Sequence, residues 1–117
     1  MDAKIELENV LASLGPAISV CDAEFKLLYM NEASAGAFAD RGGASLLGSD
    51  LKDCHKSSSV ETMRRILETG KPNVYTISKA GKKKLIWQGP WISEGETRGL
   101  VEISFVLPDT MPHYNRG

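Results

Sequence analysis

The last third of the chain alternates apolar and polar residues with the two-residue period of β-strands. Its strand-like runs lie near residues 73–79, 83–92 and 98–107. Short turns at Ala80-Gly81 and around Glu94-Gly95 separate these runs. Turns of this kind join antiparallel strands, so the sequence predicts a three-stranded antiparallel meander.

A hairpin and several helices precede the meander. The text AISVCDAEFKLLYMN holds two apolar runs joined by Asp22-Ala23-Glu24, which predicts two strands. An apolar stripe predicts a helix over about residues 3–14, and Ala-rich text after Asn31 predicts a short helix. Short helical pieces are expected over residues 45–55. The order of these segments predicts an α+β domain with an antiparallel sheet of about five strands.

The longest helix is predicted over residues 58–69. Ser58 and Glu61 have the spacing of a capping box, in which each side chain bonds a free backbone N–H of the first turn. Gly70 and Pro72 are typical of a helix end. The apolar stripe of this helix consists of Val60, Met63, Ile66 and Leu67.

Composition excludes several classes of protein. The chain of 117 residues is 42% apolar and 25% charged, which argues against disorder and against coiled-coil or collagen-like organisation. Fourteen basic and fifteen acidic side chains give a net charge of -1, which argues against a nucleic-acid binder. The N-terminus lacks the pattern of a secretory signal, and no apolar run is long enough to cross a bilayer, so we expect a cytoplasmic protein with free thiols at Cys21 and Cys54.

The text AISVCDAEFKLLYMNEASAGAF resembles the PAS family of sensory domains. It holds a family-like strand, an acidic turn at Asp22, a second strand ending in Asn31, and a helix with Ala33 and Phe38 facing inward. The following LLGSDLKD resembles the family's passage before its long helix. The resemblance spans roughly Leu7 to Leu107.

The resemblance implies a PAS-like fold in which a five-stranded antiparallel sheet has the order 2-1-5-4-3. Helices between the second and third strands would cover one face and enclose a small cavity. The corresponding domains are an N-terminal helix at 1–15, a PAS-like domain at 16–108 and a tail at 109–117. The tail resembles the end of small PAS proteins, so we expect a stand-alone protein.

Alternation along the last strands predicts which side chains share a face of the sheet. One apolar face is expected to hold Tyr75, Ile77, Leu85, Trp87, Val101, Ile103 and Phe105. The alternate set, Val74, Ile86, Ile92, Leu100 and Val106, leaves the second face in need of a cover, from the N-terminal helix or a second subunit. From this alternation and the PAS resemblance, we expect a ligand pocket lined by Phe38, Leu51, His55, Met63, Leu67, Ile77, Trp87 and Ile103.

Cys54 and His55 come just before the long helix and raise three possibilities. Adjacent side chains point in different directions and no second pair lies at a ligand spacing, so a closed zinc site is not expected. Haem needs one axial imidazole and an apolar cavity, which keeps His55 as a candidate axial ligand. Otherwise His55 hydrogen-bonds the helix entrance and Cys54 packs as a small apolar side chain. DCHKSSSV also resembles a PAS branch with a Cys-His turn here, but Lys56 and Ser57 replace that branch's prolines, so no specific ligand is carried over.

No catalytic motif is present, so we expect no enzyme activity. The sequence lacks a G-x-S-x-G text, a phosphate-binding glycine loop and an H-E-x-x-H text. The lysines at the turn near Gly81 are expected to keep a hairpin tip solvated rather than to bind nucleic acid.

The function expected from the resemblance is that of a sensory module. It would bind a small-molecule ligand or a signalling partner protein, with no nucleic acid and no membrane. A ligand would repack the long helix against the sheet. Two alternatives stay open, a haem sensor with His55 as axial ligand and a ligand-free interaction or dimerisation module. A homodimer is hypothesised through Ile5, Val10, Leu11 and Leu14.

Overall fold

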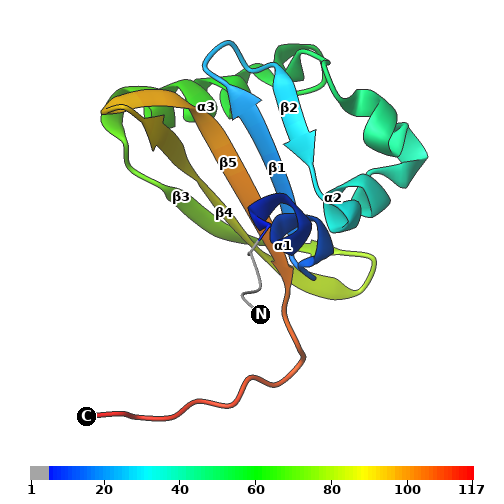
Figure 1. Ribbon diagram of the computed structural model, residues 1–117. Coiled ribbons are helices and arrows are strands. Elements are labelled where there is room, and N and C mark those ends of the chain that lie inside the picture. Colours follow the sequence, from blue (N-terminus) through cyan, green and yellow to red (C-terminus); the bar gives the residue numbers. More distant parts are fainter. Residues whose placement is uncertain (1–5) are drawn as a thin grey trace, which may run out of the picture.

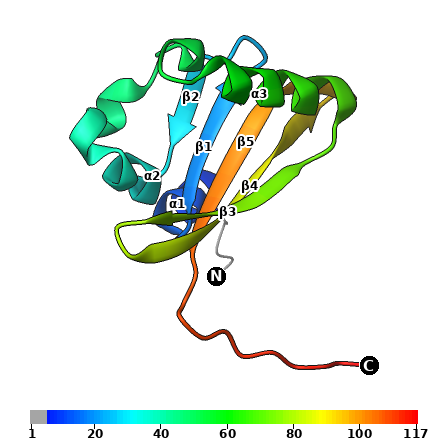
Figure 2. The ribbon, with the colours of Figure 1, turned by 180° about the vertical axis from the view of Figure 1, so that it is seen from behind.

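The computed structural model describes residues 6–117 and shows one antiparallel sheet with helices on both of its faces (Figures 1 and 2). The strands are β1 (Ala17–Asp22), β2 (Leu27–Met30), β3 (Asn73–Lys79), β4 (Lys82–Ser93) and β5 (Glu96–Val106). Their order across the sheet is β2-β1-β5-β4-β3. The predicted fold class and strand order are therefore confirmed.

The helical segments lie almost entirely between β2 and β3 in the sequence. They are α2 (Glu32–Ala37), the short 3-10 helices η1 (Ala39–Arg41), η2 (Gly43–Leu46) and η3 (Leu51–Asp53), and α3 (Ser57–Thr69). The remaining helix, α1 (Leu7–Ser13), precedes β1 and follows the extended residue Glu6. The predicted start of this helix, at residue 3, lies outside the described residues. No helix within residues 6–117 has the length and apolar composition needed to cross a bilayer.

The helices divide between the two faces of the sheet. Figure 2 shows α3 in front of β5 and β4, and α2 with the short helices beside β1 and β2. Figure 1 shows α1 on the opposite side, near one end of β1 and β5. We call these the inner face, beneath α2 and α3, and the outer face, which α1 covers at one end.

The hydrophobic core lies between α3 and the inner face. Val60, Met63 and Ile66 on α3 are buried against Phe25 and Leu100. The helix ends where predicted, at Gly70, whose φ of 73° is the left-handed conformation that glycine adopts without strain. Its start differs from the prediction, because the N-cap is Lys56, which makes no side-chain cap, and Ser58 already lies inside the first turn. The predicted Ser58–Glu61 capping box is therefore wrong.

The segment between η2 and η3 closes one edge of the sheet. The backbone N–H of Leu27 donates to the Ser49 carbonyl, and the N–H of Gly48 donates to the Leu27 carbonyl. The N–H of Leu51 donates to the Phe25 carbonyl in the same manner. The start of β2, at Leu27, and the residues just before it are thus paired by residues 48–51 on a side that would otherwise be an open edge.

The outer face carries two tryptophans that lie over glycines. A Cβ at Gly89 would overlap the Trp87 ring, and a Cβ at Gly99 would lie 2.7 Å from Trp91 Nε1. Trp91 Nε1 donates to the Cys21 carbonyl at 3.0 Å, across β5. Trp87 and Trp91 therefore share the outer face, since β4 runs without interruption through Gly89-Pro90 and its irregularity comes only after Trp91.

Candidate functional site

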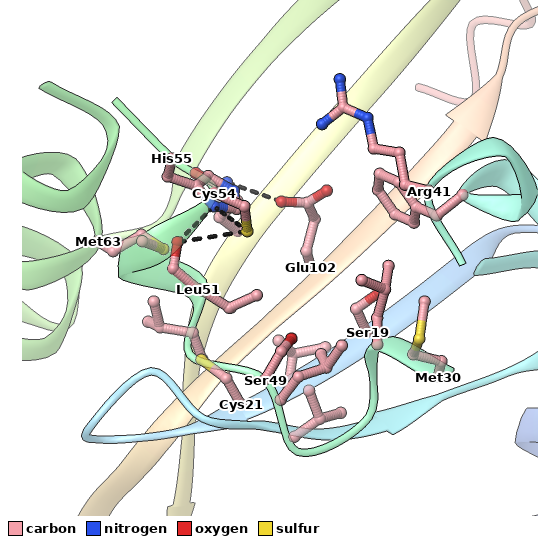
Figure 3. A pocket seen from close by; sticks show the side chains of 17 residues that line it. Ser19, Cys21, Met30, Arg41, Ser49, Leu51, Cys54, His55, Met63 and Glu102 are labelled. Atoms are coloured by element: carbon pink, nitrogen blue, oxygen red, sulfur yellow. Dashed lines mark hydrogen bonds between the residues drawn. The ribbon is translucent and has the colours of Figure 1, made fainter. Parts of the chain in front are cut away.

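A cavity of about 310 Å³ lies between the inner face and the short helices, next to α3 (Figure 3). Its volume is at the lower end of the range for small-molecule sites, roughly 300–1,000 Å³. The apolar wall comes from β1, β2 and β5, from η2 and η3, and from α3. Its large side chains are Leu27, Met30, Phe38, Leu46, Leu51, Met63 and Leu100.

A line of polar side chains runs across the inner face, one from each of four neighbouring strands, and three of them, Ser19, Gln88 and Glu102, line the cavity. The register pairs Asn73 with Gln88, Gln88 with Glu102, and Glu102 with Ser19. Asn73 Nδ2 donates to Gln88 Oε1 at 3.0 Å, and Gln88 Nε2 donates to Glu102 Oε2 at 2.8 Å. Ser19 turns the other way and bonds the Ser34 hydroxyl on α2 at 2.6 Å. We call Asn73, Gln88 and Glu102 the polar row.

The entrance of α3 brings two reactive side chains to the cavity wall. His55 Nδ1 lies 2.7 Å from the Leu51 carbonyl oxygen, and Cys54 Sγ lies 3.6 Å from the same oxygen. Because a carbonyl only accepts, His55 Nδ1 carries a hydrogen and cannot serve as a base toward the Cys54 thiol 3.4 Å away. The expectation that His55 hydrogen-bonds the helix entrance is consistent with this contact, whereas Cys54 is exposed rather than packed.

Half of the predicted pocket residues line this cavity. Phe38, Leu51, His55 and Met63 are among its lining side chains. Leu67 packs on the hydrophobic core one turn farther along α3.

The other predicted pocket residues lie elsewhere. Ile77 lines a separate cavity of about 100 Å³ between α2 and the sheet. Trp87 pairs with Ile103 next to the polar row, and neighbouring positions along a strand point to opposite faces, so both lie on the outer face. Neither side chain lines the cavity of about 310 Å³.

The register of the β3–β4 hairpin explains this correction. The turn at Ala80-Gly81 pairs Lys79 with Lys82, so Tyr75 stands opposite Ile86 rather than opposite an odd-numbered residue. Tyr75 and Ile77 thus share the inner face with Ile86, and the predicted grouping with Trp87 is wrong. Leu100 and Val106, assigned to the second face, likewise lie on the inner face because they share it with the Glu102 position on β5.

Burial perturbs two titratable side chains near the cavity. Burial raises the pKa of the Cys21 thiol, which lies in the cavity wall, and a hydrogen bond from the Leu100 backbone partly opposes it. Burial also raises the pKa of the Tyr75 phenol, and the negative charge of Glu102 adds to that effect. Both shifts favour the neutral form of the side chain.

Reasoning from the sequence missed the polar row and Arg41, which also lines the cavity. A signal for Glu102 was present, since it is a single charged residue inside the apolar run LVEISFVL on a central strand. A charge at such a position is costly unless it meets a partner, which makes it a candidate for function. In the part of the chain that the structure describes, no group of His, Cys, Asp and Glu side chains is placed to hold a metal ion.

Solved structures with the same arrangement include a PAS domain from Colwellia psychrerythraea. That likeness has a TM-score of 0.64 at 15% identity and covers 86% of this chain and 93% of the other. The Aer2 receptor from Vibrio cholerae, described as a dual PAS-heme oxygen sensor, matches with a TM-score of 0.63 at 17% identity, over 80% and 95% of the two chains. This chain has a PAS-like fold.

A third structure is the Vibrio cholerae VqmA–ligand–DNA complex, which matches the PAS-like domain with a TM-score of 0.69 at 17% identity. The likeness covers 92% of this chain and 54% of the VqmA chain, so this chain spans about half of that protein's length. No protein-family model and no curated protein matches the sequence.

Proposed function

We propose that this PAS-like domain is a sensory module that binds a small molecule in the cavity beneath α3. The observation that carries the proposal is an apolar cavity of about 310 Å³ into which a few polar groups converge, as in small-molecule sites generally. The neighbouring structures support it, because one is described as a ligand complex and another as a heme oxygen sensor.

The signal would pass through α3. Met63 touches the cavity, and its neighbours Val60 and Ile66 on the same helix belong to the hydrophobic core. A ligand that moves Met63 must therefore repack α3 against β4 and β5. The ligand shifts this equilibrium only by the difference in its affinity for the two arrangements. The output is a changed surface for a signalling partner protein.

The proposal includes no catalytic step. The cavity-lining thiol that lies next to a histidine is Cys54, and the neighbouring His55 Nδ1 is already a hydrogen-bond donor to Leu51. Cytoplasmic placement belongs to the same proposal and is supported by the two free cysteines.

A pair of adjacent leucines offers a matched test of binding. Leu46 lines the cavity, whereas Leu47 is 46% exposed and does not. Native mass spectrometry of the purified domain should show a bound small molecule in the wild type and in Leu47→Trp. The adduct should be lost in Leu46→Trp, because the indole fills the site. Equal retention in both variants would contradict binding in this cavity.

Haem is the second candidate, and one contact favours it. Since His55 Nδ1 donates to the Leu51 carbonyl, Nε2 keeps its lone pair, which is the tautomer that an axial ligand needs. The cavity volume opposes it, because a porphyrin with its two propionates needs more room than about 310 Å³. The residues therefore do not fit haem in this arrangement.

An absorption spectrum decides the haem question. Protein purified from haem-supplied cells should show no Soret band. A Soret band that disappears in His55→Ala and persists in the tail variant His113→Ala would establish a haem sensor instead.

The remaining alternative is a ligand-free interaction module. Its support is the exposed apolar surface of α1 and of the outer face. Val10 on α1 is 43% exposed, and Leu14 at the end of that helix is 41% exposed. We also propose a homodimer through α1, to which Val10, Leu11 and Leu14 contribute. Ile5, the fourth residue of the predicted interface, lies outside the described residues.

A further inference from the structure

The direction of every hydrogen bond in the polar row is fixed by its last member. A carboxylate has no hydrogen to donate, so Gln88 must turn its Nε2 toward Glu102. Gln88 Oε1 then faces β3 and accepts from Asn73 Nδ2. Both amides are thereby held in one orientation. Each of them donates a hydrogen bond toward the Glu102 carboxylate.

The Glu102 carboxylate retains acceptor capacity that the row does not use. Gln88 bonds Oε2, and within residues 6–117 no side chain or backbone group donates to Oε1. No lysine, arginine or histidine nitrogen of this part of the chain lies within ion-pair distance of Glu102. Figure 3 shows the Glu102 side chain projecting into the space between His55 and Arg41. Half-buried and facing an apolar wall, the carboxylate has lost part of its hydration.

We propose that the cavity selects ligands that donate an N–H hydrogen bond to Glu102 and pack a compact ring against the apolar wall. This inference rests on the proposed function, since it names the chemistry of the ligand in the same cavity. The donor is a protonated amine or a neutral ring N–H, and either one meets the free lone pairs of Oε1. Charge-assisted hydrogen bonds of this kind are among the strongest in proteins.

The surrounding charges define what the site rejects. A carboxylate ligand near Glu102 would place two like charges in a partly dehydrated site, which disfavours binding. Arg41 lines the same cavity but is exposed, so its charge is largely screened by solvent. Lys84 and Lys79 line the smaller cavity on the other side of Glu102 rather than this one. The local preference at the cavity floor is therefore for a donor and against an anion.

Two pairs of probes test this preference. Indole and 1-methylindole differ in a single N–H, and 2-phenylethylamine and 3-phenylpropionate differ in the sign of their charge. Dissociation constants from NMR titrations of the whole chain should favour indole over 1-methylindole by about tenfold to a hundredfold. The amine should bind and the propionate should not. Whichever of indole and 2-phenylethylamine has the lower dissociation constant then shows whether the natural ligand is neutral or cationic.

Substitutions on β5 show whether Glu102 is the acceptor. Glu102→Gln keeps the shape and should reduce the advantage of the donors, and Glu102→Leu should abolish it. Glu96→Gln is the matched control, because Glu96 is an exposed carboxylate on the same strand and outside the cavity. Thermal unfolding of each variant establishes that it folds.

The outcomes separate this inference from the proposed function. Equal affinities of indole and 1-methylindole in the wild type, or a donor advantage that survives Glu102→Leu, would overturn the donor preference and leave ligand binding intact. If none of the four probes shifts the resonances of the cavity residues while native mass spectrometry still shows a bound molecule that Leu46→Trp removes, the donor preference alone falls. If the native protein carries no bound molecule either, the ligand-binding function falls with it.

Discussion

Asn31 is the side chain that ties the most separate parts of this molecule together. It is 1% exposed, and its Oδ1 accepts from the backbone N–H of Ile18 and of Ser34, both at 2.9 Å. Its Nδ2 donates to the carbonyls of Leu11 and Pro16, both at 3.0 Å. Every donor and acceptor of the amide is thereby used. One side chain joins α1, the start of β1, the end of β2 and the first turn of α2.

We predict that Asn31→Ala lowers the free energy of unfolding by about 3 kcal/mol or more, because it leaves several buried backbone groups without partners. Urea denaturation of the purified domain measures this loss. Asn115→Ala, an exposed asparagine in the tail, should stay within about 0.5 kcal/mol of the wild type. A similarly small effect of Asn31→Ala would mean that water replaces its four hydrogen bonds without cost.

Cys21 makes the folded state less stable as the pH becomes alkaline. Burial raises the pKa of its thiol in the folded state, so the unfolded chain loses this proton first as the pH rises. The associated stability is fully present below the ordinary thiol pKa of about 8.5 and is lost as the pH rises toward the raised value. We predict that the free energy of unfolding falls with a slope approaching about 1.4 kcal/mol per pH unit over this range.

Urea denaturation at a series of pH values tests the role of Cys21. Cys21→Ala should be less stable throughout but should show a shallower decline between pH values of about 8 and 9, below the ordinary tyrosine pKa of about 10. Cys54→Ala removes an exposed thiol and should keep the wild-type slope. An unchanged slope in Cys21→Ala would assign the alkaline decline to another group.

At the scale of elements, α3 begins without a side-chain cap. Its N-cap Lys56 has φ -65° and ψ 153°, the extended geometry from which a short polar side chain bonds the first turn, but lysine cannot accept a hydrogen bond. We predict that Lys56→Asp raises the free energy of unfolding by about 1 kcal/mol, since aspartate accepts from the free N–H groups and favours the positive end of the helix.

Urea denaturation measures the free energy of unfolding of Lys56→Asp and of two comparison variants. Lys71→Asp, beyond the end of the same helix, makes the same change of charge without a cap and should not stabilise the protein. Ser58→Ala should cost little, because the Ser58 side chain makes no cap in this structure. A loss near 1 kcal/mol in the free energy of unfolding of Ser58→Ala, with no gain in Lys56→Asp, would instead support the predicted Ser58–Glu61 capping box.

Local chemistry explains which elements were predictable. The left-handed residues Ala80, Gly81, Glu94 and Gly95 produce two tight hairpins, and the turns were predicted at those positions. The identity of the faces was not predictable from alternation alone, since it depends on whether a turn pairs odd with even positions. A one-residue change in pairing moved Trp87 and Ile103 from the expected pocket to the outer face.

The candidate site was predictable where it depends on the helices and not where it depends on cross-strand partners. Phe38, Leu51, His55 and Met63 follow from segments that the PAS resemblance places over the sheet. The polar row needs the register of three strands before Asn73, Gln88 and Glu102 become neighbours. These residues are far apart in the sequence, and nothing in the chain's local pattern joins them.

At the scale of the whole molecule, the sheet is covered unevenly. The inner face carries α2, the short helices and α3, whereas α1 covers one end of the outer face (Figures 1 and 2). The outer apolar surface continues from Trp87 and Ile103 to Phe105, which is 38% exposed. On α1, Leu7 is 71% exposed. Large apolar side chains exposed on one face of a domain are typical of an interaction site.

A homodimer that buries the exposed side of α1 should form in proportion to protein concentration. We expect sedimentation velocity to show a dimer that dissociates on dilution. Val10→Asp combined with Leu14→Asp should give a monomer with an unchanged circular dichroism spectrum, because Val10 is exposed on α1, Leu14 is exposed at its C-cap, and charges there would oppose burial in an interface. Leu47→Asp places a charge on an exposed apolar residue beside the cavity instead and should leave the dimer intact. A wild-type protein that stays monomeric at the highest attainable concentration would exclude a homodimer through α1.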